Sequence, residues 1–255
     1  MQVKVQTPIL ALILLLILVS LACGALQPAS IATPEPIATP TATQTPRPSP
    51  TLRPTRTPDL AATQQVEELN AEVQSYYGRG YLTTTEGQFT QFDDFRYELA
   101  KVRWYPLIPL RDLDSDFYMK AHFKWSNADR SADISGCGFV FAIQDDQEHY
   151  GVFLDRSRIY FVQGGYFYNS IGPINGSGLV DFDNPFDHPV EADFTLIVRE
   201  AQAYVLVDDE LVGEYALLPD KLSGGKVGLS TFSGTNKDYG TRCEMTNLHL
   251  WIPEE

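Results

Sequence analysis

The aromatic residues of this chain are confined to its C-terminal part. All 30 of them, 14 Phe, 13 Tyr and 3 Trp, lie at or after Tyr76. Aromatic side chains bury large areas and dominate protein cores, so a sizeable core can form only in the last 180 residues. That length is typical of a single domain. We therefore expect one folded domain over residues 80–255.

The composition of the segment before this domain opposes folding. Residues 27–58 contain 9 Pro and 8 Thr in 32 positions. Each Pro fixes φ and lacks a backbone donor, so neither a helix nor a sheet can propagate. We expect a disordered Thr/Pro-rich stalk over residues 23–58. In the polyproline II conformation it would reach roughly 100 Å.

An apolar run precedes the stalk and ends at Cys23. Its core, residues 9–19, has the length of a signal-peptide apolar region and is too short for a comfortable membrane span. The string Ala22-Cys23-Gly24 resembles the end of a bacterial lipoprotein signal peptide, which is cleaved before a cysteine that then carries lipid. The resemblance implies a signal peptide over residues 1–22, lipidation of Cys23 and a place on the extracellular face of the cell membrane. The alternative is an uncleaved N-terminal membrane anchor.

Residues 59–79 predict a short helix between the stalk and the domain. Asp59 is a good N-terminal capping residue, and glycines at positions 78 and 80 end the helix. The apolar residues on one helical face are few: Val66, Leu69 and Val73. We expect a neck that packs weakly on the domain or frays.

The domain itself shows the period-two alternation of β-strands. Short runs of this kind are separated by turn signals such as Asp208-Asp209, and no long amphipathic helix intervenes. This pattern predicts an all-β antiparallel sandwich or barrel. The clearest case is the inward set Phe117, Met119, Ala121, Phe123 and Trp125, which alternates with the outward set Tyr118, Lys120, His122 and Lys124.

The order of these runs carries a resemblance. A strand over residues 116–125 is followed by Gly136-Cys137-Gly138-Phe139-Val140-Phe141, later by Tyr204-Val205-Leu206-Val207-Asp208-Asp209, and then by Gly225-Lys226-Val227-Gly228-Leu229. This order is similar to the concanavalin A-like lectin/glucanase superfamily, in its laminin-G-like jelly-roll form. The resemblance covers roughly residues 80–253. It implies a two-sheet antiparallel β-sandwich with a ligand site on its concave face or rim loops. Members include sugar-binding modules, glycosidases and domains that bind only protein.

The outward row on residues 118–124 is the candidate ligand site. Sugar sites pair aromatic rings with fixed polar groups, so Tyr118 could supply a ring beside Lys120, His122 and Lys124. Tyr160, on another short strand, could add a second ring. The alternative is an ordinary solvated face, because Tyr has a high β-propensity and Lys is usually exposed.

Cys137 and Cys243 lie in strand-like runs of an exported domain, which predicts a disulfide; two buried free thiols are the alternative. Three aspartates, Asp112, Asp114 and Asp116, resemble the start of a calcium loop. The loop lacks its glycine, and its twelfth position is Phe123 instead of Glu. Calcium is therefore a weak candidate, and no other cofactor is expected.

Motifs for catalysis are absent from the sequence. It contains no Glu-x-Asp-x-Glu string of retaining laminarinase-type enzymes, no Gly-x-Ser-x-Gly, no His-Glu-x-x-His and no phosphate loop. Residues 59–255 hold 32 acidic and 15 basic residues, a net charge of −17. Such a surface repels nucleic acid and anionic lipid, so we expect membrane contact through the lipid anchor only.

Three functional hypotheses follow. The first is a non-catalytic, membrane-tethered module that binds extracellular glycan. The second is a structural or protein-interaction domain that meets another surface protein and has no sugar site. The third is a glycoside hydrolase.

The anchor can be tested directly on the mature protein. Mass spectrometry of its N-terminal peptide should show a diacylglyceryl group on Cys23, because cleavage before this residue exposes it for lipidation. A peptide that begins with intact Met1, recovered from purified membranes, would contradict the prediction.

Overall fold

The computed structural model describes residues 60–113, 116–145, 147–165, 168–182, 189–222 and 224–254, with side chains from residue 64 onward. The predicted signal peptide, Cys23, the stalk and the capping residue Asp59 lie outside these ranges. Within them, no helix is both long and apolar enough to cross a membrane.

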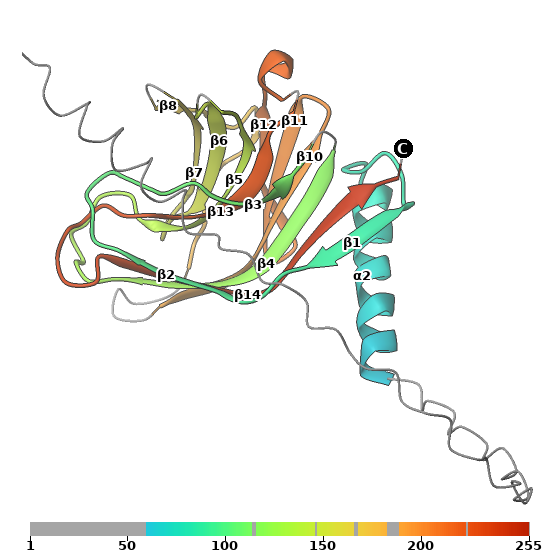
Figure 1. The fold of residues 1–255 in the computed structure, drawn as a ribbon, viewed down its shortest axis with the longest axis horizontal. Helices are drawn as coiled ribbons and strands as arrows, with labels where there is room; N and C mark the ends of the chain where they lie inside the picture. The colour runs from blue at the N-terminus through green and yellow to red at the C-terminus, as the bar shows by residue number, and fades with distance from the viewer. Residues whose placement is uncertain are drawn as a thin grey trace, which may run out of the picture. The chain divides into compact units, whose positions relative to one another are not determined.

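The described strands form two antiparallel sheets packed face to face (Figure 1). The eight-stranded sheet has the order β1 (Gly87–Gln91), β14 (Thr241–Pro253), β4 (Phe117–Asn127), β10 (Val190–Arg199), β11 (Gln202–Val207), β12 (Glu210–Ala216) and β9 (Asn175–Gly176), with β2 (Phe95–Leu99) also paired to β14. The six-stranded sheet has the order β3 (Ile108–Asp112), β13 (Lys226–Phe232), β5 (Gly136–Ile143), β6 (His149–Leu154), β7 (Ile159–Gly164) and β8 (Asn169–Ser170). The predicted two-sheet antiparallel sandwich is confirmed.

Two helical elements accompany the sheets in the described part of the chain. Helix α2 spans Leu60–Gly78, where the sequence predicts a helix, and a single 3₁₀ turn, η2, spans Pro219–Lys221.

The main core lies between the sheets and uses the predicted inward residues of β4. Phe117, Met119, Ala121, Phe123 and Trp125 are all buried in it. The ring of Phe123 bridges the sheets, because its centroid lies 5.1 Å from that of Phe139 on β5 and 4.8 Å from that of Phe194 on β10. Full burial of a side chain of this size stabilises the fold by about 1.5–3 kcal/mol.

A disulfide crosslinks the two sheets. Cys137 on β5 and Cys243 on β14 are bonded, with their Cα atoms 5.4 Å apart. Both side chains are completely buried in the main core. The predicted pairing is confirmed, and the bond closes a loop across 106 residues of sequence.

A bulge in β14 alters the alternation near its end. The pairing register with β4 shifts between Thr246 and His249, and Asn247 takes a positive φ of 53°. Asn tolerates this left-handed conformation better than most residues, and a bulge commonly redirects the side chains beside it. As a result Leu248 is buried in the core, whereas His249 lies on the outer face opposite Lys120.

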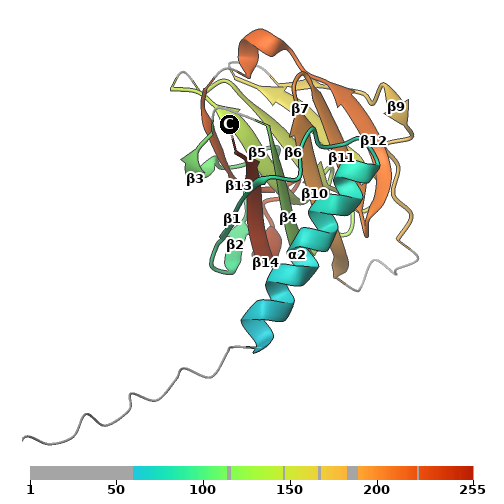
Figure 2. The same cartoon turned by 90° about the vertical axis from the view of Figure 1, so that its right-hand side faces the viewer.

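Helix α2 lies across the outer face of the eight-stranded sheet (Figure 2). Val73 and Tyr76, in its C-terminal half, are buried in a second cluster, whereas Val66 is 56% exposed. The expectation of a weakly packed or frayed neck is therefore wrong for the C-terminal half. The sheet residues under the helix are Tyr118, Ile197, Tyr204, Leu206 and Trp251.

The disulfide yields a stability prediction. Cys243→Ala should lower the free energy of unfolding by about 2–5 kcal/mol, because the unfolded chain regains the entropy of a long loop. Urea unfolding of oxidised wild type and variant measures this difference. Reductant should bring the wild type to the level of the variant and leave the variant unchanged. Quantitative alkylation of both thiols without reductant would contradict the bond.

Candidate functional site

The outer face of β14, β4 and β10 is built in four rows of paired residues. The chemical character changes along the strands, from aromatic under the helix to charged at the far end. In order, the rows are Trp251, Tyr118 and Ile197; His249, Lys120 and Thr195; Thr246, His122 and Asp193; and Glu244, Lys124 and Glu191. All four predicted site residues of β4 therefore do lie on one outward face.

The first of them, Tyr118, is not available to a ligand. Its side chain is completely buried, with its ring 5.3 Å from that of Tyr76 on α2 and 6.2 Å from that of Trp251. Its hydroxyl donates to Glu72 Oε2 at 3.1 Å. The prediction of an exposed ring is wrong because α2 covers this end of the face. Removing the ring would leave a cavity that costs about 3–5 kcal/mol.

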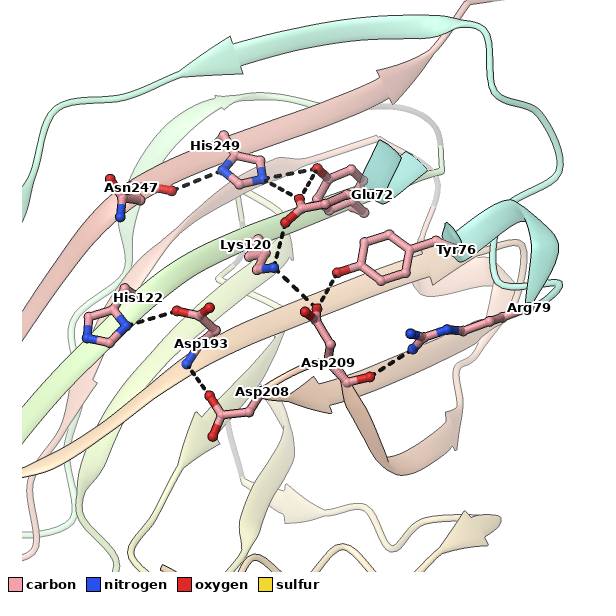
Figure 3. Close-up of polar contacts among 11 residues, drawn as sticks. Glu72, Tyr76, Arg79, Lys120, His122, Asp193, Asp208, Asp209, Asn247 and His249 are labelled. Carbon is pink, nitrogen blue, oxygen red and sulfur yellow. Dashed lines mark hydrogen bonds and ion pairs between the residues drawn. The ribbon is translucent and has the colours of Figure 1, made fainter. Parts of the chain in front are cut away.

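Lys120 is also covered and is held by two carboxylates (Figure 3). Its Nζ lies 2.7 Å from Glu72 Oε1 and 3.2 Å from Asp209 Oδ1, and only 9% of its side chain is exposed. Burial favours the neutral form of each group, but hydrogen bonds and opposite charges outweigh it. Hydrogen bonds from His249 and Lys120 lower the pKa of Glu72 to about 2, and the carboxylate partners raise the pKa of Lys120. Both groups are charged at neutral pH.

The turn between β11 and β12 supplies the second carboxylate. Asp208 and Asp209 both have positive φ, at 50° and 63°, as a tight hairpin turn requires. Asp209 accepts hydrogen bonds from Tyr76 Oη at 3.0 Å and, through its carbonyl, from Arg79 Nη1 at 2.8 Å. Asp208 accepts from the backbone N–H of Asp193 at 2.8 Å. This turn therefore ties α2 to the sheet, a role that the sequence pattern does not reveal.

His122 and Asp193 lie in the next row and are accessible. His122 Nδ1 is 2.9 Å from Asp193 Oδ1, and the two side chains are 39% and 45% exposed. One row further, Lys124 pairs with Glu191 at 2.5 Å on the open surface. Such exposed pairs contribute at most about 1 kcal/mol each to stability, so these side chains can be rearranged by a ligand at little cost.

A groove of about 720 Å³ runs between α2 and this face. Glu72 lines it from α2 and Lys120 from β4, and Leu69 is the one apolar side chain among its described lining residues. Its walls carry mainly amide, imidazole and carboxylate groups, from Gln64, Gln65, Gln91, Asp193, Asn247 and His249. Amides both donate and accept hydrogen bonds. The sequence did not indicate this groove, because its lining residues come from α2 and from four separate strands of the chain.

Tyr160 does not belong to this site. It lies on β7 of the six-stranded sheet, with its ring 5.4 Å from that of Phe232 in a cluster on the outer face of that sheet. The sandwich separates it from Lys120. The expectation that both serve one ligand is therefore wrong.

Two of the three calcium candidates, Asp112 and Asp116, lie within the described residues. Asp112 is exposed at the end of β3, and Asp116 accepts a hydrogen bond from the backbone N–H of Glu200 at 2.7 Å. Asp114 lies outside the described residues. In the part of the chain that the structure describes, no group of three or more His, Cys, Asp or Glu side chains is arranged to hold a metal ion.

Comparison with known proteins finds similarity at the level of structure. No protein-family model matches the chain, and no curated protein matches it. Similar solved structures include carbohydrate-binding module CBM66 from Bacillus subtilis, at 12% identity over 63% of this chain and 92% of that chain, with a TM-score of 0.42. A legume lectin-like domain from Entamoeba histolytica has 10% identity over 67% and 89%, with a TM-score of 0.42.

A third similar structure, β-glucanase from Bacillus licheniformis, has 10% identity over 57% of this chain and 69% of that chain, with a TM-score of 0.38. Because each TM-score is below 0.5, the two-sheet architecture rests on the strand pairing of this chain.

The ion pair under α2 predicts an acid-sensitive contribution to stability. The pKa of Glu72 is about 2 in the folded chain against an ordinary value of 4.5. Its contribution is therefore fully present above pH 4.5 and is lost as the pH falls toward 2. Glu72→Gln should lower the free energy of unfolding by about 3 kcal/mol at pH 7, and the gap from wild type should shrink between pH 4.5 and 2.

The control is Glu68→Gln, one turn earlier on the same helix, where the side chain is exposed. It should change stability little at any pH. Urea unfolding from pH 7 to pH 2.5 measures all three proteins. A Glu72→Gln gap that does not depend on pH would contradict the ion-pair account.

Proposed function

We propose that this protein is a non-catalytic binding module for extracellular glycan, anchored to the membrane through Cys23. The observation that carries the proposal is the open groove beside α2. Its walls combine amide and carboxylate side chains from four separate elements of the chain: Gln65 on α2, Gln91 on β1, Asp193 on β10 and Asn247 on β14. Sugar hydroxyls both donate and accept hydrogen bonds, and amides and carboxylates are the side chains that match them.

The electrostatics of the groove support binding over hydrolysis. A glycosidase needs a carboxylic acid whose pKa is raised, so that it can protonate the leaving oxygen. The most buried carboxyl of the groove, Glu72, has its pKa lowered to about 2 by its hydrogen bonds to His249 and Lys120. It is consequently ionised throughout the physiological range and holds Lys120 in place.

The groove also presents polar groups that are held in place before a ligand binds. Lys120 and Glu72 are locked together, and the bulge places Asn247 and His249 beside them, with His249 Nδ1 donating to the carbonyl of Asn247 at 3.0 Å. Polar groups that are held before a ligand arrives lose less conformational entropy on binding. The exposed His122–Asp193 pair continues this polar surface along β4 and β10.

The test is a glycan array probed with the full mature protein. After a binding glycan is found, Gln91→Ala and Asp193→Ala should each weaken it about tenfold, which corresponds to about 1.4 kcal/mol for a lost hydrogen bond. Both side chains are largely accessible, so the melting temperature should change little. Isothermal titration calorimetry measures the affinities.

Lys226→Ala is the matched control, because Lys226 is an exposed residue of β13 in the other sheet. It should leave the affinity unchanged. If no glycan binds, or if both groove variants bind like the wild type, the proposal fails, and capture of a surface protein becomes the better account of this face.

A further inference from the structure

The segment over residues 174–180 is hydrogen-bonded to both sheets at one edge of the sandwich. Toward the eight-stranded sheet, the backbone N–H groups of Ile174 and Gly178 donate to carbonyl oxygens of β12, at 2.7 Å and 3.0 Å. Toward the six-stranded sheet, the carbonyl of Gly178 accepts from the N–H of Ile159, the first residue of β7, at 2.8 Å. We call residues 174–180 the edge clasp, because they join β12 to β7.

The edge clasp carries the one Asn-Gly pair of the sequence. Asn175 and Gly176 make up strand β9, and both are exposed. Gly176 has a φ of 81°, and a Cβ at this position would lie 2.5 Å from the carbonyl oxygen of Val212. The fold therefore requires glycine here. Because glycine has no side chain, nothing on this residue shields its backbone nitrogen from the residue before it.

The backbone nitrogen of Gly176 lies against the side-chain amide of Asn175. Its N–H donates to Asn175 Oδ1 at 3.0 Å. The amide carbon that carries this oxygen is therefore close to the same nitrogen. Intramolecular reactions are favoured when the reacting atoms are already held about 3–3.5 Å apart. The nitrogen of the amide, Nδ2, faces Glu214 Oε2 on β12 at 3.5 Å.

We infer that Asn175 is a site of spontaneous covalent modification, at which asparagine is converted to aspartate and isoaspartate. The nitrogen of Gly176 loses its proton and bonds to the side-chain amide carbon of Asn175. The bond from that carbon to Nδ2 breaks, and ammonia leaves with the proton. Water then opens the resulting succinimide ring at either of its carbonyl carbons. The net reaction consumes a water molecule and releases ammonia, without oxidation or reduction.

Either product weakens the edge clasp. Aspartate places a second carboxylate opposite Glu214, its partner in the strand pairing, and like charges on directly paired residues are destabilising. Isoaspartate also routes the backbone through the former side chain and inserts a methylene group between Ile174 and Gly178. The hydrogen bonds of these two residues to β12 then cannot both keep their present register. The clasp therefore loosens as the protein ages.

The inference does not depend on ligand binding in the groove beside α2, because neither Asn175 nor Gly176 is among its described lining residues. No glycan enters its test, so the outcome is distinct from success or failure of the glycan array.

The test is incubation of the full mature protein at neutral pH, followed by peptide mass spectrometry. The peptide that contains Asn175 should gain one mass unit, and the rate should rise with pH because the attacking nitrogen must lose its proton. Asn169 is the matched internal control, because it begins another exposed two-residue strand, β8, and is followed by Ser170. It should react at least about tenfold more slowly, since a side chain on the following residue hinders ring closure.

Asn175→Gln keeps an amide at this position and should slow the reaction at least about tenfold, because its longer side chain must close a larger ring. Hydrogen exchange of the peptide over residues 171–180 measures the clasp. It should become at least about tenfold faster in aged wild type and stay unchanged in aged Asn175→Gln. Asn175→Asp supplies the charge without the added methylene group, so its exchange rate should lie between the two.

A reaction at Asn175 that is no faster than at Asn169 would overturn the inference. A rate in the folded chain more than about tenfold below that of the chain unfolded in urea would also overturn it, because the strand would then protect the site. Unchanged hydrogen exchange in fully modified wild type would overturn the effect on the clasp.

Discussion

The first half of strand β4 is buried on both of its faces, and the rest of the structure is arranged around that constraint. Its odd-numbered residues fill the space between the sheets, and Tyr118 and Lys120 lie beneath α2. A strand that packs one face on the core can expose its other face to water. Tyr118 lies on that other face and is completely buried, so a further element must cover it. Helix α2 is therefore part of the domain, because without it the aromatic end of this face would be exposed.

The helix is held on the sheet by two kinds of interaction. The rings of Tyr76, Tyr118 and Trp251 supply apolar contact, and the contacts of Lys120 with Glu72 and Asp209 supply charge. Burying a charged pair costs desolvation energy, but here hydrogen bonds and opposite charges outweigh that cost and lower the pKa of Glu72 to about 2. The ion pair therefore fixes the position and register of α2 and also stabilises it. Removing one partner still costs several kcal/mol, because it leaves the other charge partly buried.

Much of the fold was predictable because its signals are local. Alternation along residues 117–125 assigns the inner and outer faces of β4 correctly, and the cysteine pair was expected from its number and its exported setting. The sequence could not show which face a helix covers. The sequence predicts that Lys120 is solvated, because lysine is rarely buried. Only its partners on α2 and in the Asp208-Asp209 turn explain why it is buried.

Other errors have the same physical origin. The alternation predicts that Tyr160 points outward, and it does. Alternation does not show which sheet a strand joins, so the pattern alone groups Tyr160 with Tyr118. The helix does carry one local signal of its docking. Glu72 and Tyr76 are four residues apart, which places them on the same helical face. A carboxylate and an aromatic ring at that spacing indicate a helix face that makes both polar and apolar contacts. This face is wider than the apolar stripe of three residues that includes Val73.

The fold prepares the groove beside α2 before a ligand arrives. Polar groups such as Lys120 are already paired by the protein, so a ligand gains mainly by adding hydrogen bonds at exposed amides such as Gln91. One wall of the groove is α2 itself, so firm docking of that helix on the sheet keeps the groove formed.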